Sequence, residues 1–252
     1  MIQNPILKVL STFQNSNARN LLMGGQACVL YGGAEFSRDV DFVVAIDSEN
    51  IAVLQMVLGS LAAEPIFVPP LDPQALEKGH ACHFRCRNQE VEGVRIDLMN
   101  RMRGCPDFEE LWRERSIVAI PEVGEIGLLS LPHLVRAKKT QRNKDWPMVR
   151  RLLEADILNH SSDPTDRQIR FWLLECRTPE LLMDLAKRFS KTVRSLSEKR
   201  RALVFATEGA IEELRKELQR EEELEKEADR MYWDPLKQEL AEMKRSSRED
   251  VP

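Results

Sequence analysis

From Leu21 to Val44 the chain reads LLMGGQACVLYGGAEFSRDVDFVV. The apolar start of this stretch predicts a short buried strand, which the pair Gly24-Gly25 turns into a short helix. The continuously apolar residues 40–46 predict the next strand and are typical of a central strand covered on both faces. Asp39 and Asp41 stand at its start. Because side chains alternate along a strand, both acids project from the same face.

A third acid, Asp97, lies in a similar apolar frame, Val94 to Met99. A neighbouring strand that carries Asp97 would bring it together with Asp39 and Asp41, and three carboxylates repel one another unless a cation lies among them. We therefore expect a divalent cation, Mg²⁺ or Mn²⁺, and phosphate chemistry. The alternative is that each acid is a solvated side chain at the end of a strand.

Along the rest of the chain, the sequence pattern predicts a mixture of helices and strands first and helices alone afterwards. We expect helices from Asn4-Pro5 and Ser48, a loop at 64–73, strands within 81–99 and at 116–120, and only helices beyond Ser130, with starts at Asp163-Pro164 and Thr178-Pro179. This predicts an α/β catalytic-type domain with a mixed central sheet over 1–150. An all-helical domain over 151–245 and a disordered tail over 246–252 are expected to follow it.

The composition and the amino terminus argue against a membrane-spanning protein, a secreted protein and a general binder of nucleic acid. Of the 252 residues 42% are hydrophobic, which is enough for a core, but no apolar stretch is long enough to cross a membrane. A formal net charge of −4 gives no general attraction to nucleic acid or anionic lipid. The amino terminus lacks a secretory pattern, and five scattered cysteines are typical of reduced thiols. We therefore expect a cytoplasmic protein that does not bind a membrane.

The residues from Met23 to Phe42 resemble the first motif of the DNA polymerase β-type nucleotidyltransferase superfamily. They are most similar to its branch of AbiEii-type toxins and minimal nucleotidyltransferases, and residues 94–99 resemble the strand with that family's third carboxylate. The resemblance implies a nucleotidyltransferase fold and Mg²⁺-dependent transfer of a nucleoside monophosphate from an NTP to a hydroxyl of RNA, such as a tRNA end, or of a protein or small molecule. It also implies a role in a toxin-antitoxin or phage-defence system, with a cognate antitoxin as partner.

The same resemblance implies roles for individual residues. Gly24 and Gly25 would shape a phosphate-binding turn, and Asp39, Asp41 and Asp97 would be the catalytic metal ligands. Gln26, whose amide can donate where the family usually has Ser or Thr, and Arg38 are further candidates for phosphate binding.

A basic stretch from Leu134 to Asp145 resembles the family's basic helix, which ends in Lys-Asp. Lys138 and Arg142 share one face of the expected helix, so they would contact the phosphates of the NTP or an RNA backbone. The alternative is a solvated helix that pairs with nearby acids.

Gln26, Glu35 and Arg38 depart from the family pattern and motivate an alternative function. In that alternative the chain keeps the nucleotidyltransferase fold but is catalytically inactive, and it binds a partner protein or a nucleotide.

Two other segments have simple structural interpretations. His80 to Cys86 contains metal-ligand residue types, but no second ligand pair follows at zinc-site spacing, so a structural strand is expected. Glu208 to Arg230 is dense in charges with a narrow apolar stripe, which predicts a docking helix rather than a coiled coil.

Overall fold

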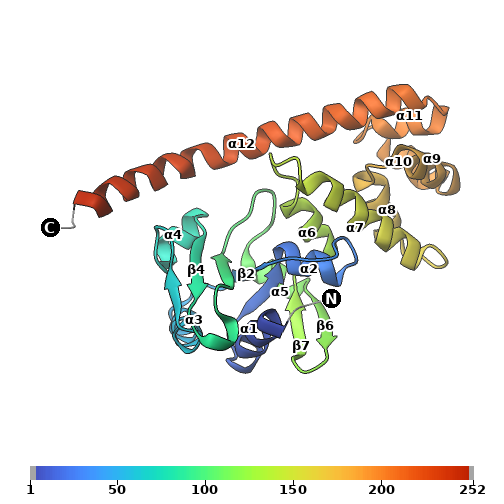
Figure 1. Cartoon of the computed structure of the whole chain (residues 1–252). Helices are drawn as coiled ribbons and strands as arrows, with labels where there is room; N and C mark the ends of the chain where they lie inside the picture. The colour runs from blue at the N-terminus through green and yellow to red at the C-terminus, as the bar shows by residue number, and fades with distance from the viewer. Residues whose placement is uncertain (1–3, 250–252) are drawn as a thin grey trace. The chain divides into compact units, whose positions relative to one another are not determined.

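The computed structural model describes residues 4–249, which form two compact units (Figure 1). Unit 1 contains the residues up to Leu30, Ala34–Ala137 and those from Met231 onward, and unit 2 contains Tyr31–Gly33 and Lys138–Arg230. The predicted boundary at residue 150 would cut helix α7 (Asp145–His160). The contacts instead change from one unit to the other at Lys138, in the turn before that helix.

Unit 1 is built on a seven-stranded mixed sheet, as the α/β pattern predicts. The strand order is β3-β4-β5-β2-β1-β7-β6, in which β2 pairs with β5 and β1 with β7 in parallel, and the other neighbours are antiparallel. The strands are β1 (Asn20–Met23), β2 (Asp39–Val44), β3 (Ala63–Pro65), β4 (Cys82–Cys86), β5 (Arg95–Met99), β6 (Ser116–Ile120) and β7 (Gly124–Leu128). In the central strand β2 the successive residues Phe42, Val43 and Val44 are all buried, so this end of the strand is covered on both faces.

Short helices cover this sheet. They are α1 (Asn4–Asn15), α2 (Gly24–Leu30), α3 (Ser48–Ser60), α4 (Pro73–Lys78), the 3-10 helix η1 (Gln89–Val91), α5 (Phe108–Arg113) and α6 (Leu131–Ala137). The apolar stripe of α1 is buried, and Phe13 stacks on Phe42 of β2 with 4.2 Å between ring centroids. The cap of α3 is Asp47 rather than the expected Ser48, since the Asp47 side chain accepts from the backbone N–H of Asn50.

Unit 2 is entirely helical beyond Lys138, as the sequence pattern predicts. It contains α7 (Asp145–His160), α8 (Asp166–Glu175), α9 (Pro179–Arg188), α10 (Ser190–Leu196), α11 (Ala202–Glu208) and the first part of α12 (Ile211–Glu249). Trp146 and Trp172 are its largest fully buried side chains. The helix expected from Asp163-Pro164 begins at Asp166, because Thr165 and Gln168 form a capping box there.

The basic stretch is not one helix, so this prediction was wrong. Helix α6 ends at Ala137 and α7 begins at Asp145. Between them, Thr140 accepts a hydrogen bond from the Trp146 indole through its carbonyl and donates its hydroxyl to the Asp145 carboxylate. These contacts hold the connecting residues in a turn, which local helix propensity does not reveal.

Helix α12 is longer than expected and continues to Glu249, with Pro235 inside it. It therefore includes the first residues of the segment predicted to be disordered, and residues 250–252 lie outside the described part. Leu214 and Leu218 are buried against unit 2, which fits a docking helix, whereas Leu224 is exposed.

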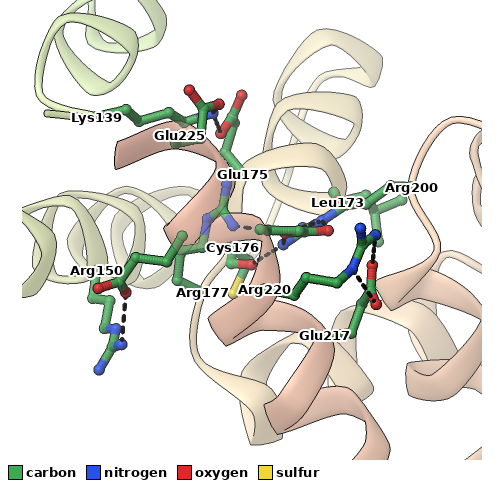
Figure 2. Close-up of polar contacts among 12 residues, drawn as sticks. Lys139, Arg150, Leu173, Glu175, Cys176, Arg177, Arg200, Glu217, Arg220 and Glu225 are labelled. Carbon is green, nitrogen blue, oxygen red and sulfur yellow. Dashed lines mark hydrogen bonds and ion pairs between the residues drawn. The ribbon is translucent and has the colours of Figure 1, made fainter. Parts of the chain in front are cut away.

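A buried ionic network connects α12 to the rest of unit 2 (Figure 2). Arg177 and Arg200 both donate to the Glu221 carboxylate, at 2.6 and 2.9 Å. Arg200 also donates to the backbone carbonyls of Leu173 and Cys176. The side chains of Arg177 and Arg200 are only 6% and 5% exposed, so their charges depend on these partners in place of water.

Within residues 4–249, no helix combines the length and the apolar character that crossing a lipid bilayer requires.

Candidate functional site

The three acids lie on one face of adjacent strands in unit 1. In the parallel pair β2–β5, Asp41 is directly opposite Asp97, and Asp39 is opposite Arg95. Adjacent strands are separated by about 4.8 Å, and residues two apart share a face. The expectation that a neighbouring strand carries Asp97 is therefore confirmed. We call Asp39, Asp41, Asp97 and Arg95 the acidic face.

The glycine pair allows the backbone to approach this face closely. Gly24 has φ +64°, and a Cβ atom there would lie 1.8 Å from Oδ2 of Asp41. At Gly25 a Cβ atom would lie 2.2 Å from Oγ of Ser37, and the Gly25 N–H donates to Asp41 Oδ2 over 3.4 Å. The turn therefore needs glycine both for its dihedral angle and for space.

Gln26 shapes the loop that leads into β2. Its side chain is 1% exposed, and Nε2 donates to the carbonyl oxygens of Ser37 and Asp39, at 3.0 and 3.4 Å. The amide predicted to bind phosphate is therefore occupied by the chain itself. Its role here is to hold the segment in which Asp39 begins the strand.

Asp97 is held by two neighbours on the same face. Its Oδ1 accepts from Nε of Arg95 at 2.7 Å and lies 2.8 Å from Nδ1 of His83, which is opposite Asp97 in the antiparallel pair β4–β5. Burial by itself would lower the pKa of the Arg95 guanidinium. The hydrogen bond to Asp97 and the negative charges of Asp97, Asp39 and Asp41 together raise this pKa above its ordinary value.

Sequence reasoning missed Arg95 and His83 as members of the site. Arg95 precedes Asp97 by two residues, so strand alternation alone could have placed both on one face. The position of His83 depends on the register between β4 and β5 and has no local signal. The structural strand expected within His80–Cys86 is present as β4, which begins at Cys82. Burial raises the pKa of the Cys82 and Cys86 thiols to about 11.

The donor chemistry of the acidic face suits a hard cation. Carboxylate oxygens on adjacent strands are the ligands that Mg²⁺ prefers. Within the described chain, however, no group of three or more His, Cys, Asp and Glu side chains is arranged to hold a metal ion. In this structure the guanidinium of Arg95 interacts electrostatically with all three acids.

Two exposed aromatic rings contact arginine or histidine side chains of unit 1. Phe67 is 51% exposed, its ring is edge-on to the His83 ring at 5.6 Å, and the Arg95 guanidinium lies 6.0 Å from its centroid. Phe36 is 47% exposed, with the guanidinium of Arg38 at 5.8 Å. Arg38, a predicted phosphate-binding residue, therefore contacts an aromatic ring just before β2.

Three cavities of unit 1 lie away from these acids. One of about 210 Å³ lies between α1 and the opposite sheet face, where Phe13, Phe42 and Trp112 line it. The other two, of about 420 and 250 Å³, are lined mainly by α1, α3 and the residues near η1. None of the three is lined by Asp39, Asp41 or Asp97.

Lys138 and Arg142 belong to unit 2, where both contact one acid. Lys138 Nζ lies 3.8 Å from Oδ1 of Asp145, and Arg142 Nε donates to Oδ2 of the same residue at 2.9 Å. Asp145 is 3% exposed in its side chain. The two cations are thus brought together by a buried carboxylate rather than by a shared helical face.

Neither a scan against models of protein families nor a search of curated proteins found a match to this chain.

Proposed function

We propose that the chain is a nucleotidyltransferase of the DNA polymerase β-type fold. It moves a nucleoside monophosphate from an NTP to a hydroxyl acceptor, which is RNA, in particular a tRNA end, or a protein. In this proposal it depends on Mg²⁺ or Mn²⁺, acts in the cytoplasm and belongs to a toxin-antitoxin or phage-defence pair. The resemblance of the Met23–Phe42 and Val94–Met99 segments supports the family and the acceptor class.

The single observation that carries the proposal is the register of β2 and β5. Asp41 and Asp97 are direct partners, Asp39 shares their face, and the Gly24-Gly25 turn contacts Asp41. Three acids in this arrangement would be costly unless a positive charge neutralised them, and a phosphate substrate needs the same neutralisation.

In the proposed reaction the acceptor hydroxyl attacks the α-phosphorus of the NTP, and the bond to the bridging oxygen breaks with release of pyrophosphate. Asp39 and Asp41 would hold the divalent cation, whose charge would stabilise the phosphates. Asp97 would hold a second cation or accept the proton of the attacking hydroxyl. The missing Cβ atoms of Gly24 and Gly25 would let the phosphates approach the backbone.

An inactive binding module of the same fold is the second candidate. Two observations favour it. The Gln26 amide is buried and used by the chain, and Asp97 already has Arg95 and His83 as partners. Such a module would hold a partner protein or a nucleotide without turnover.

Label transfer from each of the four NTPs separates the two candidates. The full chain is incubated with Mg²⁺, bulk RNA or bulk protein, and labelled NTP, beside Asp41→Asn and the exposed control Glu49→Gln. We expect transfer by the wild type and Glu49→Gln and a loss of about 100-fold or more in Asp41→Asn, the scale of removing one charge-stabilising group. Absence of transfer to both acceptors, with no metal-dependent NTP binding, would refute the enzyme.

Asp97→Asn tests the role of the third acid separately. The variant should still bind NTP, because Asp39 and Asp41 remain, but it should lose most of its turnover. Normal turnover in this variant would show that the role proposed for Asp97 is wrong.

A further inference from the structure

Arg95 is a positive charge within the acidic face. Its Nε donates to Asp97 at 2.7 Å, its Nη2 lies 3.0 Å from Nδ1 of His83, and its backbone is opposite Asp39. Arg95 thus interacts electrostatically with all three carboxylates of the acidic face, and its direct hydrogen bond is to Asp97.

The side chain of Arg95 is able to leave this position without opening the core. It is 31% exposed, whereas that of Asp97 is 12% exposed. The ring of Phe67 is its outer neighbour, and that ring is itself half exposed. A long, partly solvated side chain of this kind exchanges rotamers readily compared with a side chain packed in the core.

We propose that Arg95 sets the divalent-cation affinity of the acidic face, because its guanidinium occupies Asp97 and is displaced when a divalent cation binds. This inference rests on the proposed function, since it assumes that the three acids are metal ligands. Arg95 is a positioning residue here, and it acts through Asp97. Two cations that need the same carboxylate oxygens exclude each other, and each also repels the other electrostatically.

His83 also takes part in the replacement of Arg95 by a divalent cation at Asp97. Nδ1 contacts both Asp97 and Arg95, and it can donate to the carboxylate or accept from the guanidinium, but a single tautomer does not do both. When Arg95 leaves, Nδ1–H is available to Asp97 alone. His83 would then keep the carboxylate oriented, as partners of metal-bound carboxylates usually do.

The inference is tested without any turnover by measuring Mn²⁺ binding to the full chain. The electron paramagnetic resonance signal of free Mn²⁺ reports how much of the ion remains unbound. We expect Arg95→Gln to bind Mn²⁺ about tenfold more tightly than the wild type, because one competing charge is gone. Arg95→Lys keeps the charge and should bind close to the wild type. Phe67→Ala loosens the neighbour of Arg95 and should fall between the wild type and Arg95→Gln. Thermal unfolding of each variant checks that it is folded.

The outcomes separate this inference from the proposed function. Equal or weaker Mn²⁺ binding by folded Arg95→Gln, while the wild type binds, overturns the inference and leaves the proposed function in place. If neither binds Mn²⁺, both the inference and the metal-dependent function fail. Binding by Arg95→Gln that disappears in the double variant Arg95→Gln/Asp97→Asn supports the exchange at Asp97.

Discussion

The two units each contain a cluster of charged side chains, and the clusters differ in burial. In unit 2, three cations face three acids: Lys139, Arg177 and Arg200 with Glu175, Glu221 and Glu225 (Figure 2). In unit 1, three acids share Arg95 at a partly exposed position. The cations of the first cluster are at most 8% exposed, whereas Arg95 in the second is 31% exposed.

The pKa values of the arginines in the two clusters are shifted in opposite directions. Burial, together with the neighbouring charge of Arg200, lowers the pKa of Arg177 despite its acidic partners. The opposite holds for Arg95, where the acids outweigh burial and raise the pKa. A buried ionic network is typical of a structural role, whereas clustered charge at a partly exposed position is typical of a ligand site.

The largest effect should come from breaking the buried network. Glu221→Ala removes the carboxylate that both Arg177 and Arg200 contact and leaves two buried cations without it. We expect the free energy of unfolding to fall by about 3–5 kcal/mol. Chemical denaturation beside the exposed control Glu213→Ala, expected to change it by less than about 0.5 kcal/mol, measures this. A small loss in Glu221→Ala would show that this network is not structural.

A smaller loss is expected at the glycine turn of the acidic face. Gly24→Ala forces a Cβ atom toward Asp41 and a φ of +64° on alanine, so we expect a cost of about 1–3 kcal/mol. Gly59→Ala is the matched control, because nothing lies within 4 Å of its Cβ position in α3. The free energies of unfolding of both variants are measured by chemical denaturation. If they are the same, glycine is not required for steric reasons at position 24.

The acids of the acidic face should contribute little net stability, because their mutual repulsion offsets their contacts with Arg95 and Gly25. Asp41→Asn removes one of several like charges, so we expect the free energy of unfolding to stay unchanged or rise by up to about 1 kcal/mol at low salt. Added salt should shrink this difference through screening. A clear destabilisation would place these acids with the structural network of unit 2.

The smallest effect should come from Glu239, a carboxylate whose side chain is 38% exposed. Glu239 of α12 accepts from His80 and Lys78, and these hydrogen bonds hold its pKa below the ordinary 4.5. A lowered folded-state pKa means that the stabilisation is present above 4.5 and is lost as the pH falls through the lowered value. The difference in denaturation midpoint between wild type and Glu239→Gln should therefore be small at pH 7 and vanish in acid. A difference that grows in acid would contradict this assignment.

Part of the fold could be read from local patterns. The strands β1, β2 and β6 and the helices after Lys138 follow from apolar runs and capping residues. Strand β7 was missed because two of its five residues are glycine, which has low strand propensity. The tight packing of Gly127 against Leu21 gives a reason for one of them, and only the assembled sheet reveals it.

The amino-acid sequence by itself determined that Asp39 and Asp41 share a face and follow a glycine turn, because both features depend on neighbours within a few residues. Tertiary structure alone decided that Asp97 faces Asp41, that His83 contacts Asp97, and that Asp145 contacts both Lys138 and Arg142. The physical reason is that strand register and turn contacts are set by packing between segments distant in the chain, whereas alternation and capping are local.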